Sequence, residues 1–490
     1  MARINKFDGA VSFAPAGGDD WAYAQLNRPL TAGDRLWVDP GGRAELHVGA
    51  AALRVNEQTS LGFVELDDDT VTIKVTQGTI SLRVRNLPRD QHYEIQTPNL
   101  AFVPNAPGEY RIDVAPDGST TNIAIREGGG VAYGENGAGV SVPGRQQSRF
   151  TGRRLTPAGA STALPGDSFE DWVRNRDHAE DASISARYVP REVIGYQQLD
   201  DNGTWQETAE YGPVWTPRVV AAGWAPYRTG HWAWIQPWGW TWIDDAPWGF
   251  APYHYGRWAY LGNRWSWVPG RQIRVAPPVY APALVAFVGG RGASLTLSFG
   301  GTRSNGVAWF PLAPGEIYRP AYTASPRYIN NVNRTTIVNN TTVNNVIVNN
   351  TTVNKTVYVN QQAPNAITAV PSTTFVRGQA VAPVAKALPR QQLAGAILAA
   401  APGVAPIKQS FLGDARPAQR PVAASFSRVA PVAMTPAARK ELHTAALPIA
   451  DKAGAEKQQA VAPAGVNRMP VPQDQLGLAV TSAARKDMPV

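Results

Sequence analysis

The feature that most constrains this chain is an aromatic unit that occurs three times between residues 202 and 270. The copies are "NGTWQETAEYGPVWTP" (202–217), "TGHWAWIQPWGWTWID" (229–244) and "YGRWAYLGNRWSWVPG" (255–270). In each copy two tryptophans lie nine or ten residues apart, with turn residues between or after them. A unit of this length cannot bury a core alone. The repeat therefore predicts a domain of stacked β-hairpins over residues 201–325, with three units of about 26 residues and a closing segment.

The alternation inside each unit predicts which aromatic side chains share a face. Residues two apart on a strand point the same way, so in the second unit four tryptophans would face one another across a turn. Such a face either forms the domain core, where large aromatic side chains usually lie, or binds a glycan or peptide. The candidate binding residues are Trp232, Trp234, Trp240, Trp242, Trp258, Tyr260, Trp265 and Trp267. Among them Trp234, Trp240, Tyr260 and Trp265 are expected at an accessible rim.

Residues 1–150 alternate apolar and polar side chains between turn signals, which is typical of half-buried antiparallel strands. We predict hairpins at 36–48, 71–85 and 110–125, each with a glycine-containing turn. The pattern indicates an antiparallel sandwich or small barrel of about eight to ten strands.

Motifs in this first region resemble a known family. "LTAGDRLWVDPGGRAELHVG" (30–49) is followed in order by "LRVNEQTSLGF", "VTQGTISLRV", "YEIQTPNLAFV" and "GEYRIDV". Over residues 1–150 they resemble the FecR-type domain, the periplasmic module of iron-transport signalling regulators. The resemblance implies an exported β domain, and hence a periplasmic or envelope location with a signal peptide encoded upstream of this chain. It also implies an alternative function as a signalling component that regulates transcription indirectly through an envelope partner. The sigma-binding helices and membrane span of anti-sigma members are not found before this region, which argues against direct sigma-factor control.

The tryptophan-rich block carries a second resemblance. It continues through "APALVAFVGG" (281–290) and "VAWFPLAPGEIYRP" (307–320). The block resembles a family of unassigned function that follows FecR-type domains in envelope proteins of Gram-negative bacteria.

The connector, residues 151–200, contains one amphipathic segment. "DSFEDWVRNRDHAED" predicts a helix over about 168–181, with Ser168 and Asp171 as an approximate capping box. Its apolar residues Phe169, Trp172 and Val173 fall on one side and predict packing against a neighbouring domain.

The last third of the chain differs in composition from the rest. Residues 326–360 are an Asn/Val/Thr-rich low-complexity segment, which predicts an extended stalk. Residues 361–490 are rich in alanine and proline and contain no tryptophan, which predicts a disordered tail. Residues 301–490 hold 19 lysines and arginines against 7 acidic residues, so the basic charge lies mainly in this tail. We expect the tail to contact an anionic surface, and we expect neither specific nucleic-acid binding nor a transmembrane segment.

No residue pattern indicates catalysis. The chain has no cysteine, which excludes disulfides and thiolate chemistry. Adjacent Asp244 and Asp245 would point apart on an extended chain, although a glycosidase needs converging carboxylates. His231 and His254 lack a third ligand, so we expect no metal and no cofactor. We predict a non-enzymatic extracytoplasmic binding or scaffold protein, with envelope polysaccharide, peptidoglycan or a protein as partner; a carbohydrate-active enzyme is the second alternative.

Overall fold

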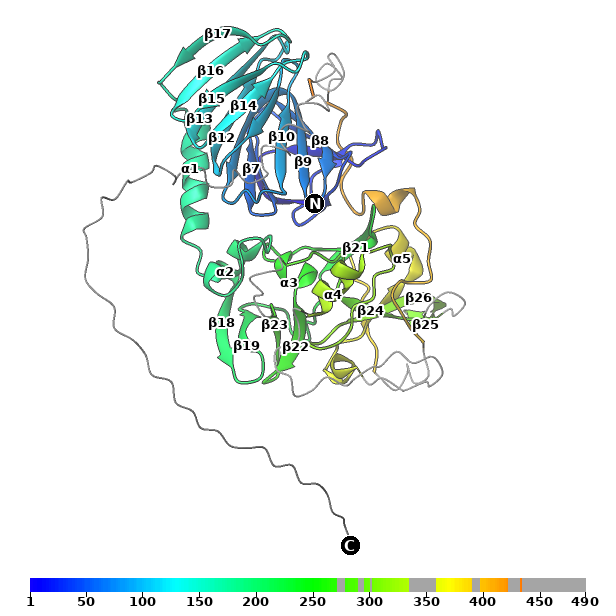
Figure 1. The fold of residues 1–490 in the computed structure, drawn as a ribbon. Coiled ribbons are helices and arrows are strands. Elements are labelled where there is room, and N and C mark those ends of the chain that lie inside the picture. Colours follow the sequence, from blue (N-terminus) through cyan, green and yellow to red (C-terminus); the bar gives the residue numbers. More distant parts are fainter. Residues whose placement is uncertain are drawn as a thin grey trace, which may run out of the picture. The chain divides into compact units, whose positions relative to one another are not determined.

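The computed structural model describes residues 1–270, 278–289, 295–299, 302–334, 358–389, 397–421 and 432–433. Residues 1–442 form one compact unit. The described part is mainly β, with antiparallel sheets and few helices, which confirms the predicted fold class (Figure 1). None of its helices has the length and apolar character that crossing a bilayer requires.

The N-terminal strands form two sheets that share one long strand, β9. The first sheet has the order β4-β1-β6-β7-β9-β12-β13-β16-β17, and the second β3-β2-β5-β8-β9-β10-β11-β14-β15. The strands are β1 (Ala2–Asp8), β2 (Val11–Ala14), β3 (Ala22–Tyr23), β4 (Pro29–Leu30), β5 (Arg35–Val38), β6 (Arg43–Val48), β7 (Ala51–Val55), β8 (Thr59–Leu66), β9 (Thr70–Val84), β10 (His92–Gln96), β11 (Ala101–Pro104), β12 (Gly108–Val114), β13 (Thr120–Glu127), β14 (Gly129–Tyr133), β15 (Gly139–Pro143), β16 (Gln146–Thr151) and β17 (Thr156–Ser161). There are more strands than predicted, and they extend past residue 150 because β16 and β17 complete the first sheet.

Alternation along these strands places one set of side chains in the core. In β12, for example, Tyr110, Ile112 and Val114 are buried while the residues between them are partly exposed. One apolar cluster joins residues from most strands of both sheets. The period of two in the sequence thus corresponds to the inner and outer faces of a sandwich.

Two of the three predicted N-terminal hairpins are wrong. Residues 71–85 contain no turn, because β9 is continuous through Gly78. This glycine has φ +92°, and a Cβ on it would lie 2.3 Å from the Thr59 hydroxyl oxygen, so it permits the close approach of β8. In 36–48 the Pro-Gly-Gly turn connects β5 and β6, which pair in different sheets. The hairpin at 110–125 is confirmed, because β12 pairs with β13.

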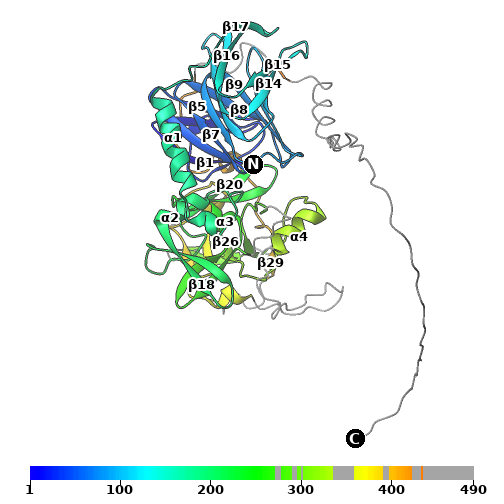
Figure 2. The ribbon, with the colours of Figure 1, turned by 60° about the vertical axis from the view of Figure 1, so that its left-hand side comes forward.

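Helix α1 (Ser168–Asp181) has the predicted bounds and lies against the N-terminal strands (Figures 1 and 2). The predicted capping box is wrong by one residue. Asp167 is the N-cap, and its carboxylate accepts a hydrogen bond from the backbone N–H of Glu170 at 2.9 Å. Phe169 and Val173 are buried on the predicted apolar side of the helix.

The three aromatic units form the three predicted hairpins. The first and third share a sheet of order β18-β19-β23-β22, and the second is a separate two-stranded sheet, β20-β21. Their strands are β18 (Gly203–Thr208), β19 (Gly212–Pro217), β20 (Gly230–Ile235), β21 (Gly239–Asp244), β22 (Arg257–Leu261) and β23 (Arg264–Val268). The short helices around them are η1 (Ser185–Arg187), η2 (Tyr196–Gln198), α2 (Leu199–Asn202) and α3 (Ala251–His254).

The prediction of disorder from residue 361 is wrong for 361–389 and 397–421. The third sheet of the aromatic region has the order β28-β27-β26-β24-β29, with β25 also paired to β26. Its elements and the remaining helices are β24 (Val285–Val288), β25 (Leu295–Phe299), β26 (Thr302–Pro311), α4 (Pro326–Arg334), η3 (Val359–Gln362), β27 (Thr368–Pro371), α5 (Ser372–Val376), β28 (Lys386–Ala387), β29 (Leu398–Ala399) and η5 (Lys408–Phe411). The predicted stalk begins instead as helix α4, and its 335–357 portion lies outside the described residues, as do 434–490 of the tail.

Candidate functional site

The paired tryptophans of each unit lie directly opposite one another on neighbouring strands. The cross-strand pairs are Trp205 with Trp215, Trp232 with Trp242, and Trp258 with Trp267. A second pair in the middle hairpin joins Trp234 to Trp240, with ring centroids 5.5 Å apart. The alternation in the sequence therefore predicted both the pairs and their register.

These aromatic side chains are core and not an open platform. Of the eight candidate binding residues, Trp232, Trp240, Trp242, Trp258, Trp265 and Trp267 are buried, and only Trp234 and Tyr260 are partly exposed. The expected accessibility of Trp240 and Trp265 is wrong, since they are 7% and 4% exposed. An indole buried on both faces has no surface on which a sugar or peptide could stack.

Residues from the C-terminal segment complete this core and explain why Trp240 is covered. The ring of Phe375 on α5 lies 4.6 Å from that of Trp240 and 5.3 Å from that of Trp232. The indole N–H of Trp240 donates to the backbone oxygen of Val404 at 3.3 Å. No periodic pattern in the sequence indicates these contacts, because Phe375 and Val404 lie in the alanine- and proline-rich region.

The acidic pair beside the tryptophans does not converge. Asp244 is buried, where its carboxylate accepts hydrogen bonds from the Trp242 indole at 3.1 Å and the Ala246 backbone at 3.0 Å. Burial raises the pKa of Asp244 to about 8, although these hydrogen bonds oppose the rise. Asp245 is exposed. The arrangement is a buried turn carboxyl beside a solvated one, which is not the geometry of a glycosidase.

The two candidate histidines are separated and have structural contacts. His254 is buried, and one ring nitrogen lies 2.8 Å from the backbone oxygen of Ala281. Burial lowers its pKa to about 3, so it is neutral at physiological pH. His231 lies 3.8 Å from Asp245. Across the described residues, no group of three histidines or carboxylates is placed to hold a metal ion.

A polar junction connects the N-terminal sandwich to the aromatic region. Arg3 of β1 is fully buried and donates to Gln198 at 2.9 Å and to Asn27 at 2.6 Å. Asn27 in turn donates to the backbone oxygens of Asp244 and Ala246 at 2.8 and 2.7 Å. Polar groups buried in this way contribute directional hydrogen bonds that fix one relative placement of the two modules.

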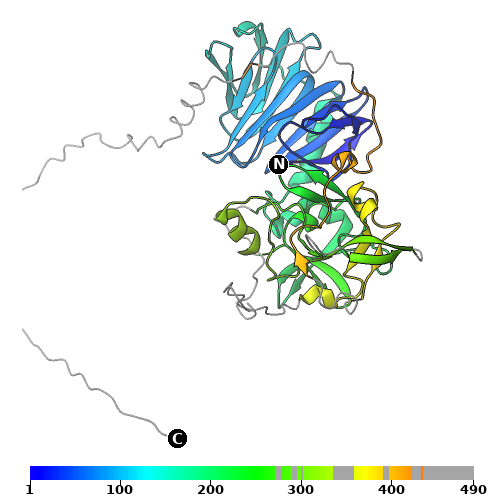
Figure 3. The same ribbon diagram turned by 90° about the vertical axis from the view of Figure 1, so that its right-hand side faces the viewer.

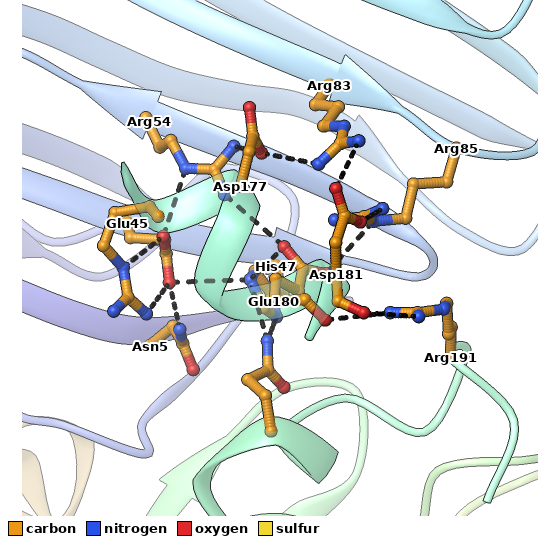
Figure 4. Close-up of polar contacts among 12 residues, drawn as sticks. Asn5, Glu45, His47, Arg54, Arg83, Arg85, Asp177, Glu180, Asp181 and Arg191 are labelled. Atoms are coloured by element: carbon orange, nitrogen blue, oxygen red, sulfur yellow. Dashed lines mark hydrogen bonds and ion pairs between the residues drawn. The ribbon is translucent and has the colours of Figure 1, made fainter. Parts of the chain in front are cut away.

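A second polar cluster, drawn in Figure 4, holds α1 against β6, β7 and β9. At its centre the fully buried guanidinium of Arg54 lies 3.1 Å from Glu45, 2.6 Å from Asp177 and 3.4 Å from Glu180. A further cation, Arg176 of α1, lies 2.9 Å from Glu45. We call these residues, together with His47, Arg83, Arg85 and Asp181, the helix clamp.

The charges of the clamp set the protonation of its members. Burial alone would raise the pKa of Glu45, but the hydrogen bond from Arg176 and the charge of Arg54 outweigh it, and the pKa is well below its usual value. His47 is buried between Glu45 and Glu180 at 3.7 and 3.9 Å. Burial, with the charges of Arg54 and Arg3, lowers the pKa of His47 although the two carboxylates oppose this, so the ring is neutral at physiological pH. The clamp is thus a network of ionised Glu and Arg around a neutral histidine.

Sequence reasoning missed both polar clusters. For the helix clamp, the available signal was the strand "RAELHV", where polar Glu45 and His47 alternate with apolar Ala44 and Leu46. That pattern predicts a polar face but does not identify its partner, which α1 supplies from more than 125 residues away.

The comparisons with known proteins identify one region. Residues 196–316 match the model described as a family of unknown function (DUF6600). This range contains all three aromatic hairpins and agrees with the second resemblance in the sequence. No curated protein matches the chain.

Two solved structures are weakly similar. Both are crystal structures described as a "putative anti-sigma factor" from Parabacteroides distasonis, 9% and 8% identical to this chain, each with a TM-score of 0.24. Each match covers 28% of this chain and 63% or 64% of the other. A similarity this low does not establish a common fold, and the FecR-type resemblance of residues 1–150 stays a prediction.

Proposed function

We propose that this chain is a non-enzymatic scaffold protein of the cell envelope, in which the aromatic region is a structural core fixed to the N-terminal sandwich. The observation that carries the proposal is the burial of the cross-strand tryptophan pairs. A stretch so rich in indole, if it served mainly as a binding face, would leave its rings accessible to ligand. Here the rings fill the interior of a region otherwise poor in large aliphatic side chains.

The hydrogen-bonded connection between the two modules supports a scaffold role. Arg3 and Asn27 of the N-terminal sandwich donate hydrogen bonds to residues of the aromatic region and its connector. The C-terminal segment makes a second connection, because it runs from the aromatic region back to the sandwich. Residues of this segment contact the N-terminal sandwich at β3, where Tyr23 donates to the Arg416 backbone and Ala418 donates to the Trp21 backbone, both at 2.9 Å (Figure 3). Two modules connected at two separate places, one of them among buried side chains, are limited in their relative motion, which is a property that a scaffold needs.

The position of the acidic pair supports the non-enzymatic part of the proposal. Asp244 accepts two hydrogen bonds from its own hairpin and is shielded from solvent, so it cannot reach a glycosidic oxygen. Asp245 alone lacks the second carboxylate that hydrolysis of a glycoside requires.

The motifs at 30–49 favour a second candidate, an envelope signalling component that acts on transcription through a partner. It predicts that deletion of the gene changes transcription of a regulated locus, and that an Arg54→Met variant, which weakens the helix clamp, alters that output. A scaffold would show no such transcriptional change.

The location of the protein can be tested by thiol labelling, because the chain has no cysteine of its own. Val219 is 83% exposed, so a Val219→Cys variant expressed from the natural reading frame gives a single accessible thiol. In cells with a permeabilised outer membrane and an intact inner membrane, we expect a membrane-impermeant maleimide to label this variant. Val214→Cys, at a buried position of similar side-chain volume, is the matched control and should label only after denaturation. Labelling of Val219→Cys only after lysis of the inner membrane would refute an extracytoplasmic location.

A further inference from the structure

The N-terminal sandwich has a hollow on the outer face of its first sheet, beyond the part that α1 covers. The hollow has a volume of about 490 Å³ and lies over β12, β13, β16 and β17. Its lining residues are Asp113, Val114, Ala115, Thr120, Asn122, Gln147, Arg149, Gly159, Ala160 and Ser161. We call this the sheet groove. It is separate from the tryptophan core and from the helix clamp.

The strand register explains why this face is hollow. One row of facing residues runs from Asp113 through Asn122 and Arg149 to Gly159. At its outer end Gly159 has no side chain, and a Cβ there would meet no atom within 4 Å. The next row on the same face pairs Gln147 with the small Ser161, and both residues line the groove. The long polar side chains of β13 and β16 therefore lie beside the small residues of β17, and this difference in size leaves open space above the sheet.

The polar groups of the sheet groove are arranged across the strands. The Asn122 amide donates to the Gln147 amide oxygen at 3.2 Å, which orients both side chains. Asp113 is already engaged, because it accepts from Thr79 at 2.8 Å and pairs with Arg111 at 3.0 Å. Arg149 is exposed, and within the described part of the chain no ion pair neutralises it. The groove therefore offers oriented amide donors and acceptors beside one uncompensated positive charge.

This chemistry fits an acidic oligosaccharide. Amide side chains donate to and accept from sugar hydroxyls, and a guanidinium binds a carboxylate through two parallel hydrogen bonds. The three inter-strand spacings of the groove span roughly 14 Å, enough for a short oligosaccharide laid across the strands. We propose that the sheet groove binds a glycan that carries carboxylate groups, with Arg149 at a carboxylate and Asn122 and Gln147 at ring hydroxyls.

Other occupants fit less well. The apolar side chains of the lining are those of Val114, which is only 4% exposed, and of two alanines, so an apolar ligand or a peptide side chain would bury little side-chain surface there. Strand addition along the edge strand β17 is opposed by Pro157 and by a register shift in the β16–β17 pairing. The glycan assignment goes beyond the scaffold role and does not depend on the tryptophan core.

The test is a calorimetric titration of the full chain with trigalacturonate as the acidic probe and maltotriose as the neutral probe. We expect binding of trigalacturonate and at least roughly tenfold weaker binding of maltotriose, since a charged hydrogen-bonded pair is lost. Arg149→Ala should weaken trigalacturonate binding by a similar factor, and so should the double variant Asn122→Ala with Gln147→Ala. Arg154→Ala, an exposed arginine outside the groove, and Gln206→Ala, an exposed amide on β18, are matched controls that should not change affinity.

Three results would overturn the proposal. The first is no binding of trigalacturonate at millimolar concentration. The second is equal weakening by Arg149→Ala and Arg154→Ala, which would indicate general attraction of an anion to a basic chain. The third is equally tight binding of a short poly-glutamate peptide, which would remove the role of the sugar hydroxyls. Each result leaves the scaffold proposal intact, because that proposal rests on the buried tryptophan pairs and not on the sheet groove.

Discussion

Replacing Arg54 with methionine should destabilise the folded unit strongly. The guanidinium is fully buried and contacts three carboxylates, Glu45, Asp177 and Glu180, at 2.6 to 3.4 Å. Methionine has a similar volume but leaves those carboxylates without their central cation. Removing one partner of a buried ion pair typically costs about 3–5 kcal/mol. Because Arg176 and Arg85 still face Glu45 and Glu180, we expect the lower part of that range.

The measurement is the free energy of unfolding from urea titration at pH 7, followed by circular dichroism. Arg174→Met is the matched control, because Arg174 forms an exposed ion pair with Asp171 on the same helix. Exposed pairs contribute about 0–1 kcal/mol, so the control should change stability little. Raising the salt concentration should leave the Arg54 effect largely unchanged, since buried charges are screened poorly. A loss of less than about 1 kcal/mol for Arg54→Met, or equal losses in the two variants, would refute the conclusion that the clamp holds α1.

Three further predictions follow from burial and contact. Trp232→Ala should lower the free energy of unfolding by about 3–5 kcal/mol in the same urea assay. Trp234→Ala, at a half-buried position on the same strand, should lower it by clearly less. Truncation after residue 396 removes the contacts of 397–421 with the Trp240 indole and with β3. Limited proteolysis should therefore cut the truncated chain faster, and the full chain should yield a resistant fragment that extends beyond residue 400. Equal rates of cleavage would contradict this prediction. Burial lowers the pKa of His47, so the unfolded chain binds a proton below about pH 6.5 that the folded chain does not. The contribution of His47 to stability should therefore fall by up to about 1.4 kcal/mol per pH unit as the pH decreases from about 6.5, in addition to that of the buried His254. His47→Gln should reduce the total slope, and an unchanged slope would show that other groups cause it.

The sequence by itself determined the local β structure of the aromatic region and one helix. In the hairpins, glycine turns and period-two tryptophans define both strands and the residues that face one another, and the structure pairs Trp232 with Trp242 accordingly. For α1, the apolar spacing and polar ends define the bounds. These elements are readable because all the residues that determine each one lie within about 16 positions of each other.

Patterns with non-local partners were misread. A Gln-Gly dipeptide at 77–78 is a turn signal in isolation, yet β9 stays extended because β7, β8, β10 and β12 pair along it. Similarly, the Pro-Gly-Gly turn after Val38 leads to another sheet, since the partner strands of β5 and β6 come from elsewhere in the chain. Turn chemistry specifies a change of direction, but the pairing energy of distant strands decides whether and where it is used.

Only the tertiary structure decided which side of each element is buried and by what. The period of two in the tryptophan hairpins is the same for a core and for a ligand platform, and Phe375, from a region that composition assigned to disorder, covers Trp240. Glu45 and Arg54 are likewise buried only because α1, from a distant part of the chain, packs over them and supplies their partners. Burial depends on contacts between segments that lie far apart in the sequence, and periodicity within one segment does not indicate those contacts.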